Sequence, residues 1–406
     1  MAFTKRAFDN VKALGSRHPQ VLRDLLGRFP EHVQQWELDL TAENLDLAAI
    51  RDAFMAEDIP EELDDILYLS TALGDSTGWD MIERQTEEDH LQLPHHNADL
   101  TDTDMAVLAA IHNWPANLNL LERANARARI HAKSVFKYFP PEIDVRHQYR
   151  APTPAALAEA VQTLQEHYVS KGFIHSSQRD SVRIIPYDFE HEIWFLIAYA
   201  AKKQRFRGCQ NDGAMQSFDY NPEQYDAVVY NKVFGDIRMN TRNWRKNDHA
   251  KYRLAIGRML LDNGGVFSPS KKMVSLKPLV RPDAADLFAT DDIPGLAEIE
   301  PVELMFEPLN APRIETLSAA KGSSLRIDGK YTPRLLPQDV KVLRAVFEYR
   351  LTDSRRRGRL TLSPGNKIGY DRDGDSLVLE QWLRARGFLF SLVENAANGI
   401  AIQEAA

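Results

Sequence analysis

The chain has 406 residues, a net charge of −8 and a hydrophobic content of 44%, values typical of a globular protein with two or three domains. Its amino-terminal stretch is polar and basic, and no window approaches the roughly 18 consecutive apolar residues of a membrane helix, so we expect neither a secretory signal nor a membrane span. Cys209 is the single cysteine, which excludes an internal disulfide and a cysteine-based zinc cluster, and we expect a cytoplasmic protein.

Charge is distributed unevenly along the chain. Residues 31–104 contain 21 acidic and two basic residues, whereas residues 238–281 contain 11 basic and two acidic residues. Residues 321–386 are again basic, with 15 basic and eight acidic residues. A polyanion responds to local charge rather than to net charge. The two basic regions therefore predict either nucleic-acid binding or packing against the acidic region.

Residues 1–149 are predicted to form an acidic helical domain. Apolar residues recur three and four positions apart in most of this region, as expected for helices that bury one side. Pro60 followed by Glu61 and Glu62 marks a helix start, because acidic side chains are favourable near the amino-terminal end of a helix. The predicted helices cover about 24–29, 43–54, 60–69, 103–111 and 118–136.

Residues 150–282 are predicted to form a central mixed α/β domain. Thr153 and Pro154 begin an amphipathic helix that Gly172 ends. The following segments are rich in aromatic and β-branched residues, which favour strands, and a connection containing Gly235 joins the last two of them. The predicted strands cover 182–186, 192–199, 226–230 and 236–240, and a helix follows at 248–262.

Residues 283–320 are predicted to form a linker rich in proline and acidic residues. Between Asp283 and Glu307 there are eight acidic residues and no Lys or Arg. Proline blocks helices and the like charges repel one another. We therefore expect no long regular structure between Pro278 and Pro312.

Residues 321–406 are predicted to form a winged-helix-like domain. The order is a helix, a short strand, a second helix and a two-stranded ribbon, which resembles a winged helix. The stretch Leu379–Leu389 resembles the last helix of such a domain running into its wing. Winged helices bind DNA, bind proteins or only pack against other domains, so the resemblance concerns architecture. The predicted elements cover 337–351, 359–362, 376–386, 388–393 and 400–403.

The basic regions supply the predicted nucleic-acid contacts. Lys251 and Arg258 are seven residues apart and share one face of a helix that buries its apolar side. Basic residues interleaved with Trp244 suit phosphate contact with occasional base stacking. A solvated face paired with the acidic domain is the alternative interpretation. The predicted binding residues are Arg242, Trp244, Arg245, Lys246, Lys251, Arg258, Lys271, Lys272, Arg355, Arg356 and Arg357.

An enzymatic hypothesis rests on Asp226 and Asp236. Metal-dependent nucleases hold a divalent ion beside a phosphate with carboxylates at the ends of adjacent strands, and commonly place a lysine nearby. Asp226 and Asp236 lie on successive predicted strands, and Arg238 occupies the position of the lysine, in a pattern similar to that of restriction-like nucleases. Arg238 departs from this pattern, because arginine stays protonated.

The sequence contains no phosphate-binding loop, dinucleotide fingerprint, nucleophile elbow or zinc-binding helix motif, so we expect no cofactor and no metal. We therefore expect an α+β multidomain protein that is not an enzyme. It is interpreted as a nucleic-acid-associated regulator or accessory subunit of a DNA-handling complex. A scaffold subunit that binds a protein partner or a second copy of itself is the first alternative, and a metal-dependent nuclease is the second.

Overall fold

The chain divides into two compact units, Met1–Ala132 and Lys133–Ala406. The fold comes from a computed structural model that describes residues 5–56, 58–94, 99–113, 120–131, 135–145, 148–188, 191–209, 215–241, 248–280, 286–308, 313–319, 325–327, 330–331, 340–352, 357–370 and 376–390. Within these residues no helix combines the length and apolar character needed to cross a membrane.

The first unit is helical, as predicted. Side chains cap several of its helices: Asp46 accepts hydrogen bonds from two backbone amides, and Thr101 and Asp104 cap one another reciprocally. Apolar side chains from most of these helices form one buried core. The helices are α1 (Val11–Leu14), α2 (Pro19–Leu26), α3 (Pro30–Gln35), α4 (Leu47–Phe54), α5 (Glu61–Ala72), α6 (Ser76–Glu88), α7 (Asp102–His112) and α8 (Leu120–His131).

The second unit contains a ten-stranded antiparallel sheet with the order β2-β3-β6-β7-β1-β14-β13-β12-β8-β9. Its first strand, β1, lies in the middle and pairs with β7 and β14. The strands are β1 (Val135–Phe139), β2 (Arg183–Asp188), β3 (Glu192–Ala200), β6 (Glu223–Asn231), β7 (Ile237–Asn240), β8 (Leu296–Pro308), β9 (Glu315–Ser318), β12 (Val340–Leu351), β13 (Arg357–Ser363) and β14 (Lys367–Tyr370).

Two further strand pairs stand outside this sheet. The pair β4 (Gln204–Cys209) and β5 (Met215–Tyr220) forms an antiparallel ribbon, and β10 (Arg326–Ile327) pairs with β11 (Lys330–Tyr331). Two short 3₁₀ helices, η1 (Ser176–Ser181) and η2 (Lys277–Val280), complete the regular structure of the described residues.

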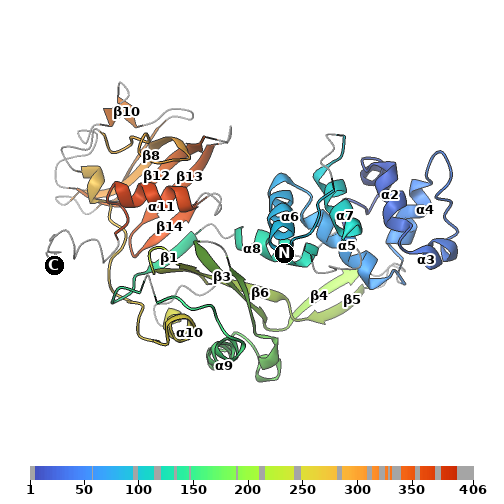
Figure 1. The fold of residues 1–406 in the computed structure, drawn as a ribbon, viewed down its shortest axis with the longest axis horizontal. Coiled ribbons are helices and arrows are strands. Elements are labelled where there is room, and N and C mark those ends of the chain that lie inside the picture. Colours follow the sequence, from blue (N-terminus) through green and yellow to red (C-terminus); the bar gives the residue numbers. More distant parts are fainter. Residues whose placement is uncertain are drawn as a thin grey trace. The chain divides into compact units, whose positions relative to one another are not determined.

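Helices cover both faces of the sheet (Figure 1). Helices α9 (Pro154–Ser170) and α10 (His249–Leu261) pack on one face, where Phe195 and Ile197 of β3 join their core. Helix α11 (Ser376–Ala385) lies on the other face. Successive strand residues point to opposite faces, so Trp194 and Arg238 point away from α9 and α10. Because of this alternation, the buried polar side chains around Arg238 and those around Asp226 lie on opposite faces of the sheet.

The structure confirms the mixed α+β class and several local predictions. Strand β3, the hairpin of β6 and β7, and helices α9, α10 and α11 lie where the sequence predicts them. Thr153 caps α9, and Gly172, with φ of +66°, follows its end. A left-handed residue at that point is readily supplied by glycine.

Two predictions on segment structure are wrong, and a third is wrong at one end. The predicted helix at 337–351 is instead strand β12, which pairs with β8 and β13. Pro278–Pro312 contains the 13-residue strand β8, so long regular structure is present where the linker was predicted. The helix predicted at 118–136 is confirmed over Leu120–His131, but Val135 and Phe136 at its predicted end belong to β1.

The predicted domain layout is not confirmed. Residues of the predicted central domain, linker and C-terminal domain contribute strands to the same sheet, and β1 precedes the boundary predicted at residue 149. The winged-helix order is not confirmed either, because its first helix is β12. The predicted wing strands, apart from Phe388–Phe390, lie outside the described residues.

Candidate nucleic-acid interface and buried polar networks

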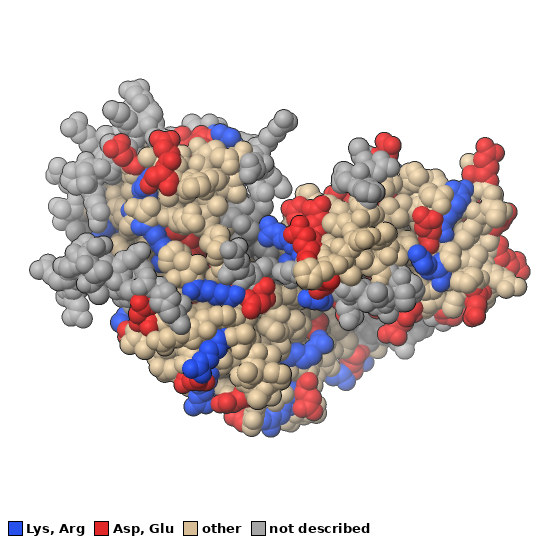
Figure 2. Space-filling model, viewed as in Figure 1, with Lys and Arg blue, Asp and Glu red and all other residues tan. Residues whose placement is uncertain are grey.

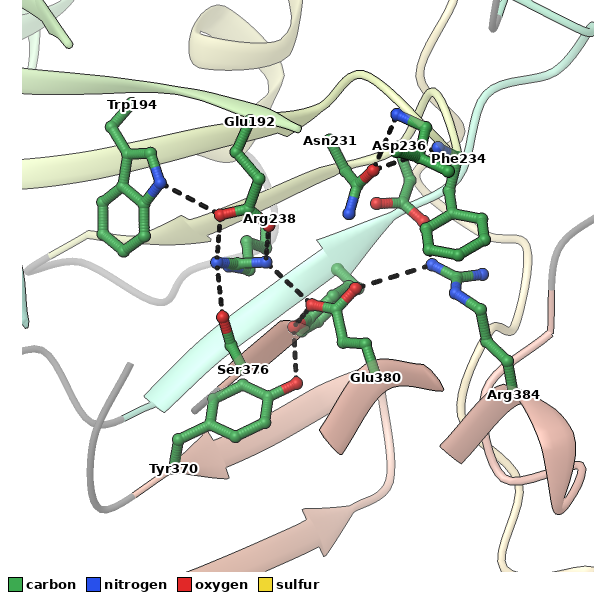
Figure 3. A network of polar contacts seen from close by, with 12 residues as sticks. Glu192, Trp194, Asn231, Phe234, Asp236, Arg238, Tyr370, Ser376, Glu380 and Arg384 are labelled. Atoms are coloured by element: carbon green, nitrogen blue, oxygen red, sulfur yellow. Dashed lines mark hydrogen bonds and ion pairs between the residues drawn. The ribbon is translucent and has the colours of Figure 1, made fainter. Parts of the chain in front are cut away.

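Arg238 lies at the centre of a buried network between the sheet and α11 (Figure 3). Its Nη1 donates hydrogen bonds of 2.7 Å to Glu192 Oε1 and to Glu380 Oε1. Its Nη2 donates to Glu192 Oε2 at 2.9 Å and to Ser376 Oγ at 3.1 Å. Trp194 Nε1 donates to the same Glu192 carboxylate at 3.0 Å. Arg238 therefore joins β3, β7 and α11.

The network continues through the polar side of α11. Ser376, Glu380 and Arg384 are spaced four residues apart, which places them on one side of the helix. Arg384 Nη2 donates to Asp236 Oδ2 at 2.7 Å, and its guanidinium lies 3.6 Å from the centroid of the Phe234 ring. A polar stripe that would be exposed on a recognition helix is thus buried here.

Tyrosines of the two central strands complete the network. Tyr138 Oη donates to Glu380 Oε1 at 2.6 Å and lies 2.8 Å from Tyr370 Oη. Tyr138 comes from β1 and Tyr370 from β14, so Glu380 is bonded to the middle of the sheet. Its carboxylate is fully buried, with 0% exposure.

Among the residues that the structure describes, the network carries more negative than positive groups. Glu192, Glu380 and Asp236 supply three carboxylates, and Arg238 and Arg384 supply two guanidinium groups. Burial raises the pKa of Glu192, opposed by Arg238 and reinforced by Glu380. Burial likewise raises the pKa of Asp236, opposed chiefly by Arg384. These groups are inaccessible to a substrate, and the arrangement serves to bind α11 to the sheet.

Asp226 belongs to a second network on the opposite face. Tyr168 Oη of α9 donates to Asp226 Oδ2 at 2.9 Å, and Tyr252 Oη of α10 donates to the same oxygen. The two hydroxyl oxygens, Tyr252 Oη and Tyr168 Oη, lie 2.9 Å apart. Burial raises the pKa of both tyrosines well above the ordinary value, and the nearby Asp226 carboxylate adds to the shift.

The structure does not bring Asp226 and Asp236 together. Asp226 faces α9 and α10, whereas Asp236 faces α11 across the sheet, and Arg238 is held by carboxylates. A shared ion requires both carboxylates within about 2.0–2.6 Å of it, which groups on opposite faces cannot provide. Among the described residues no group of three or more His, Cys, Asp or Glu is placed to hold a metal ion. The geometry therefore does not support the nuclease hypothesis.

Five of the predicted nucleic-acid-binding residues are described. Lys251 and Lys272 are exposed. Arg258 lies 3.5 Å from Glu159, Lys271 lies 2.7 Å from Glu142, and Arg357 lies 3.1 Å from Glu298. Carboxylates next to these three basic groups offset their charge, and Figure 2 shows Lys and Arg interspersed with Asp and Glu on the visible face. Arg242, Trp244, Arg245, Lys246, Arg355 and Arg356 lie outside the described residues.

Three exposed lysines gather at the C-terminal end of α9, and we call Lys171, Lys202 and Lys251 the lysine surface. Lys202 Nζ lies 3.4 Å from the position that a Cβ atom on Gly172 would occupy. Lys171 Nζ lies 3.0 Å from Asp248 Oδ1, just before α10, and Lys251 follows in the first turn of that helix. The Asp248 carboxylate is almost entirely buried, whereas the lysine surface faces solvent.

A buried histidine lies within the field of these charges. Burial lowers the pKa of His167, Asp248 opposes the shift, and Lys171 and Lys251 reinforce it. Both lysines therefore act on one imidazole, which agrees with their closeness in space. Sequence reasoning identified Lys251 but missed Lys171 and Lys202, because they lie in elements distant in sequence.

No protein-family model matches this sequence, and a search of curated proteins finds no similar one.

Proposed function

We propose that this protein binds nucleic acid through the lysine surface, as an accessory or regulatory subunit rather than as an enzyme. The supporting observation is that three separate elements bring exposed ammonium groups to one place. The Asp248 carboxylate, which lies beside Lys171, is almost entirely buried. In sequence, α10 directly follows the segment that contains Arg242, Trp244, Arg245 and Lys246.

This arrangement suits the phosphate backbone better than a single-residue ligand site. Lysine is a point charge on a flexible stem, so it contacts phosphates without requiring one fixed geometry. Each phosphate that the protein neutralises releases condensed counterions, which makes binding depend on salt and only weakly on sequence. We therefore expect largely sequence-independent binding.

The test is a titration of fluorescently labelled duplex DNA at several salt concentrations. The triple variant Lys171→Gln, Lys202→Gln and Lys251→Gln should flatten the slope of log affinity against log salt by up to about 2.7, since each neutralised phosphate contributes about −0.9. Undetectable binding by the unaltered protein at the lowest salt would refute the proposal.

A second triple variant controls for net charge. Arg258→Gln, Lys271→Gln and Arg357→Gln remove the same number of positive charges from residues that all have carboxylate neighbours, whereas in the lysine surface Lys171 has such a neighbour, Asp248, and the described residues show none for Lys202 or Lys251. We expect this variant to change the slope by less than about 1, because those groups are already partly neutralised. Equal effects of the two triple variants would mean that net charge, rather than the lysine surface, governs binding.

The scaffold alternative is favoured by one edge of the sheet. Strand β9 ends the strand order, and the neighbouring Ile314 is 62% exposed. Among the described residues no strand pairs with the outer edge of β9, and an open edge strand beside an exposed apolar residue is a site where another chain can add. Sedimentation of the protein over a range of concentrations tests self-association, and Ile314→Glu should abolish any dimer that uses this edge. A monomer at all concentrations contradicts self-association.

A further inference from the structure

A buried histidine, His167, lies where the last turn of α9 meets the start of α10, two helices that lie side by side (Figure 1). The residue is only 4% exposed. Its ring centroid lies 5.9 Å from that of Phe173 and 6.0 Å from those of Tyr168 and Tyr252. Burial raises the pKa of both tyrosine hydroxyls well above the ordinary value, so these neighbours stay uncharged. Aromatic rings therefore shield the imidazole from water.

The imidazole also lies close to charges of the lysine surface. Lys171 follows His167 by one helical turn, and its backbone N–H donates to His167 O at 3.0 Å. Lys171 Nζ in turn lies 3.0 Å from Asp248 Oδ1. Lys251 is exposed and directly precedes Tyr252, whose ring contacts the imidazole. Among the described residues, two ammonium groups and one carboxylate thus act on His167.

The Nε2 atom of His167 is buried and makes no hydrogen bond with any described residue. Buried polar atoms are nearly always hydrogen-bonded, so this exception calls for an explanation. Protonation of an imidazole makes both of its nitrogens donors. A ring without a hydrogen bond at Nε2 loses none at that atom when it takes up a proton. The geometry is therefore compatible with a histidine that changes its charge.

The unbound protein disfavours the charged form. Burial lowers the pKa of His167, Asp248 opposes this shift, and Lys171 and Lys251 reinforce it. A group that adds negative charge beside the two lysines would offset their effect, because an opposite charge nearby favours an ionised group. Phosphate groups of a nucleic acid supply such a charge at the lysine surface.

We propose that His167 takes up a proton when nucleic acid binds to the lysine surface, so that binding strengthens as the pH falls. This inference rests on the proposed function and adds its regulation by pH. A phosphate beside Lys171 and Lys251 offsets the charges that oppose the imidazolium, and Asp248 remains as a favourable neighbour. Because the ring is shielded from water, this change acts on it with little screening. Binding and protonation then promote one another, since coupling between two binding equilibria is reciprocal.

The first experiment measures the affinity of the full chain for a labelled DNA duplex between about pH 5.5 and about pH 8 at one low salt concentration. We expect the affinity to rise at least about threefold as the pH falls, since each unit by which the complex raises the pKa of His167 corresponds to up to about tenfold in affinity. His167→Gln removes the titrating group and should abolish most of this rise. His175→Gln, at an exposed histidine just before η1, is the matched control and should retain it.

The second experiment counts protons in the unaltered protein and needs no variant. Calorimetric titration with the same duplex near pH 6, in two buffers that differ in heat of ionisation, should show uptake of up to about one proton per bound chain. Circular dichroism verifies the fold of each variant. Binding without proton uptake, or with the same pH dependence in His167→Gln, would refute the inference and leave the proposed function intact. Absence of DNA binding at low salt would refute both.

Discussion

Replacing Arg238 with methionine should destabilise the second unit far more than replacing Glu380 with glutamine. Methionine keeps much of the length of arginine but removes the charge that pairs with Glu192 and Glu380, both buried. Three carboxylates would then remain with the single guanidinium of Arg384. Breaking a buried ion pair by removing one partner costs about 3–5 kcal/mol of unfolding free energy.

Glu380→Gln removes a negative charge from the network, whereas Arg238→Met removes a positive one. The glutamine Oε1 can still accept the hydrogen bonds from Tyr138 and Arg238, while two carboxylates now match two guanidinium groups. We expect a cost of about 1 kcal/mol or less, the scale of one weakened hydrogen bond. Adding Glu380→Gln to Arg238→Met should recover part of the loss, since the two groups are in contact and their effects are not additive.

Urea unfolding of the full chain, followed by circular dichroism at pH 7, measures the difference in unfolding free energy between these variants. With a slope of about 3 kcal/mol/M, a loss of 3–5 kcal/mol lowers the midpoint by about 1–1.7 M. The charge argument is refuted if Glu380→Gln costs as much as Arg238→Met, or if Arg238→Met costs less than about 1 kcal/mol.

The pH dependence supplies a second measurement of the same network. The pKa of Glu192 is raised in the folded protein by burial and, in part, by Glu380. A carboxyl group with a raised pKa contributes stability that is present below its unfolded pKa, about 4.3, and is lost as the pH rises through the folded pKa. Because Glu380→Gln removes one cause of the shift, stability should fall less steeply with rising pH in that variant. Identical pH profiles would contradict this account.

Three further predictions concern other parts of the second unit. Tyr252→Phe removes a hydroxyl that donates to buried Asp226 and should cost about 1.5–3 kcal/mol in urea unfolding; a loss under about 0.5 kcal/mol would contradict it. Burial and nearby cations lower the pKa of His249 to about 4, so its contribution to stability is present above about pH 6.5 and falls towards pH 4 by up to about 1.4 kcal/mol per unit. His249→Gln should flatten this decline, and an unchanged slope would count against it. Gly257→Ala should lower the thermal midpoint despite the better helix propensity of alanine, because the new Cβ would lie 2.4 Å from Asn263 O; a higher midpoint would show that the backbone yields.

Local patterns were sufficient to predict α9 and β3 but not β12. Thr153 and Gly172 delimit α9, and the aromatic and β-branched residues of β3 favour a strand. Val340–Leu351 carries apolar residues three apart, which is a helical spacing. In the structure the pairing of β12 with β8 shifts register at three places, including the step from Val342 to Arg344. Such bulges break the alternation that identifies a strand.

The buried networks depend on pairings between distant segments, which the sequence does not reveal. Asp226, Asp236 and Arg238 were selected because they follow one another along a hairpin. Which face each side chain occupies depends on register, and a shift of one residue reverses it. The partner Glu380 lies 142 residues from Arg238. A local signal for its role existed, since Ser376, Glu380 and Arg384 form a polar stripe on a helix whose other residues, apart from the exposed Gln381, are apolar.

The central position of β1 imposes an order on folding during synthesis. Phe139 pairs with Ile237 of β7, about 100 residues later, and Tyr138 bonds to Tyr370 of β14, 232 residues later. A ribosome that adds roughly 5–20 residues per second releases β14 about 12–46 s after β1. During that interval β1 can pair at most with β7, and its other edge stays open to wrong partners. The strand that is made first is therefore among the last to have both edges paired.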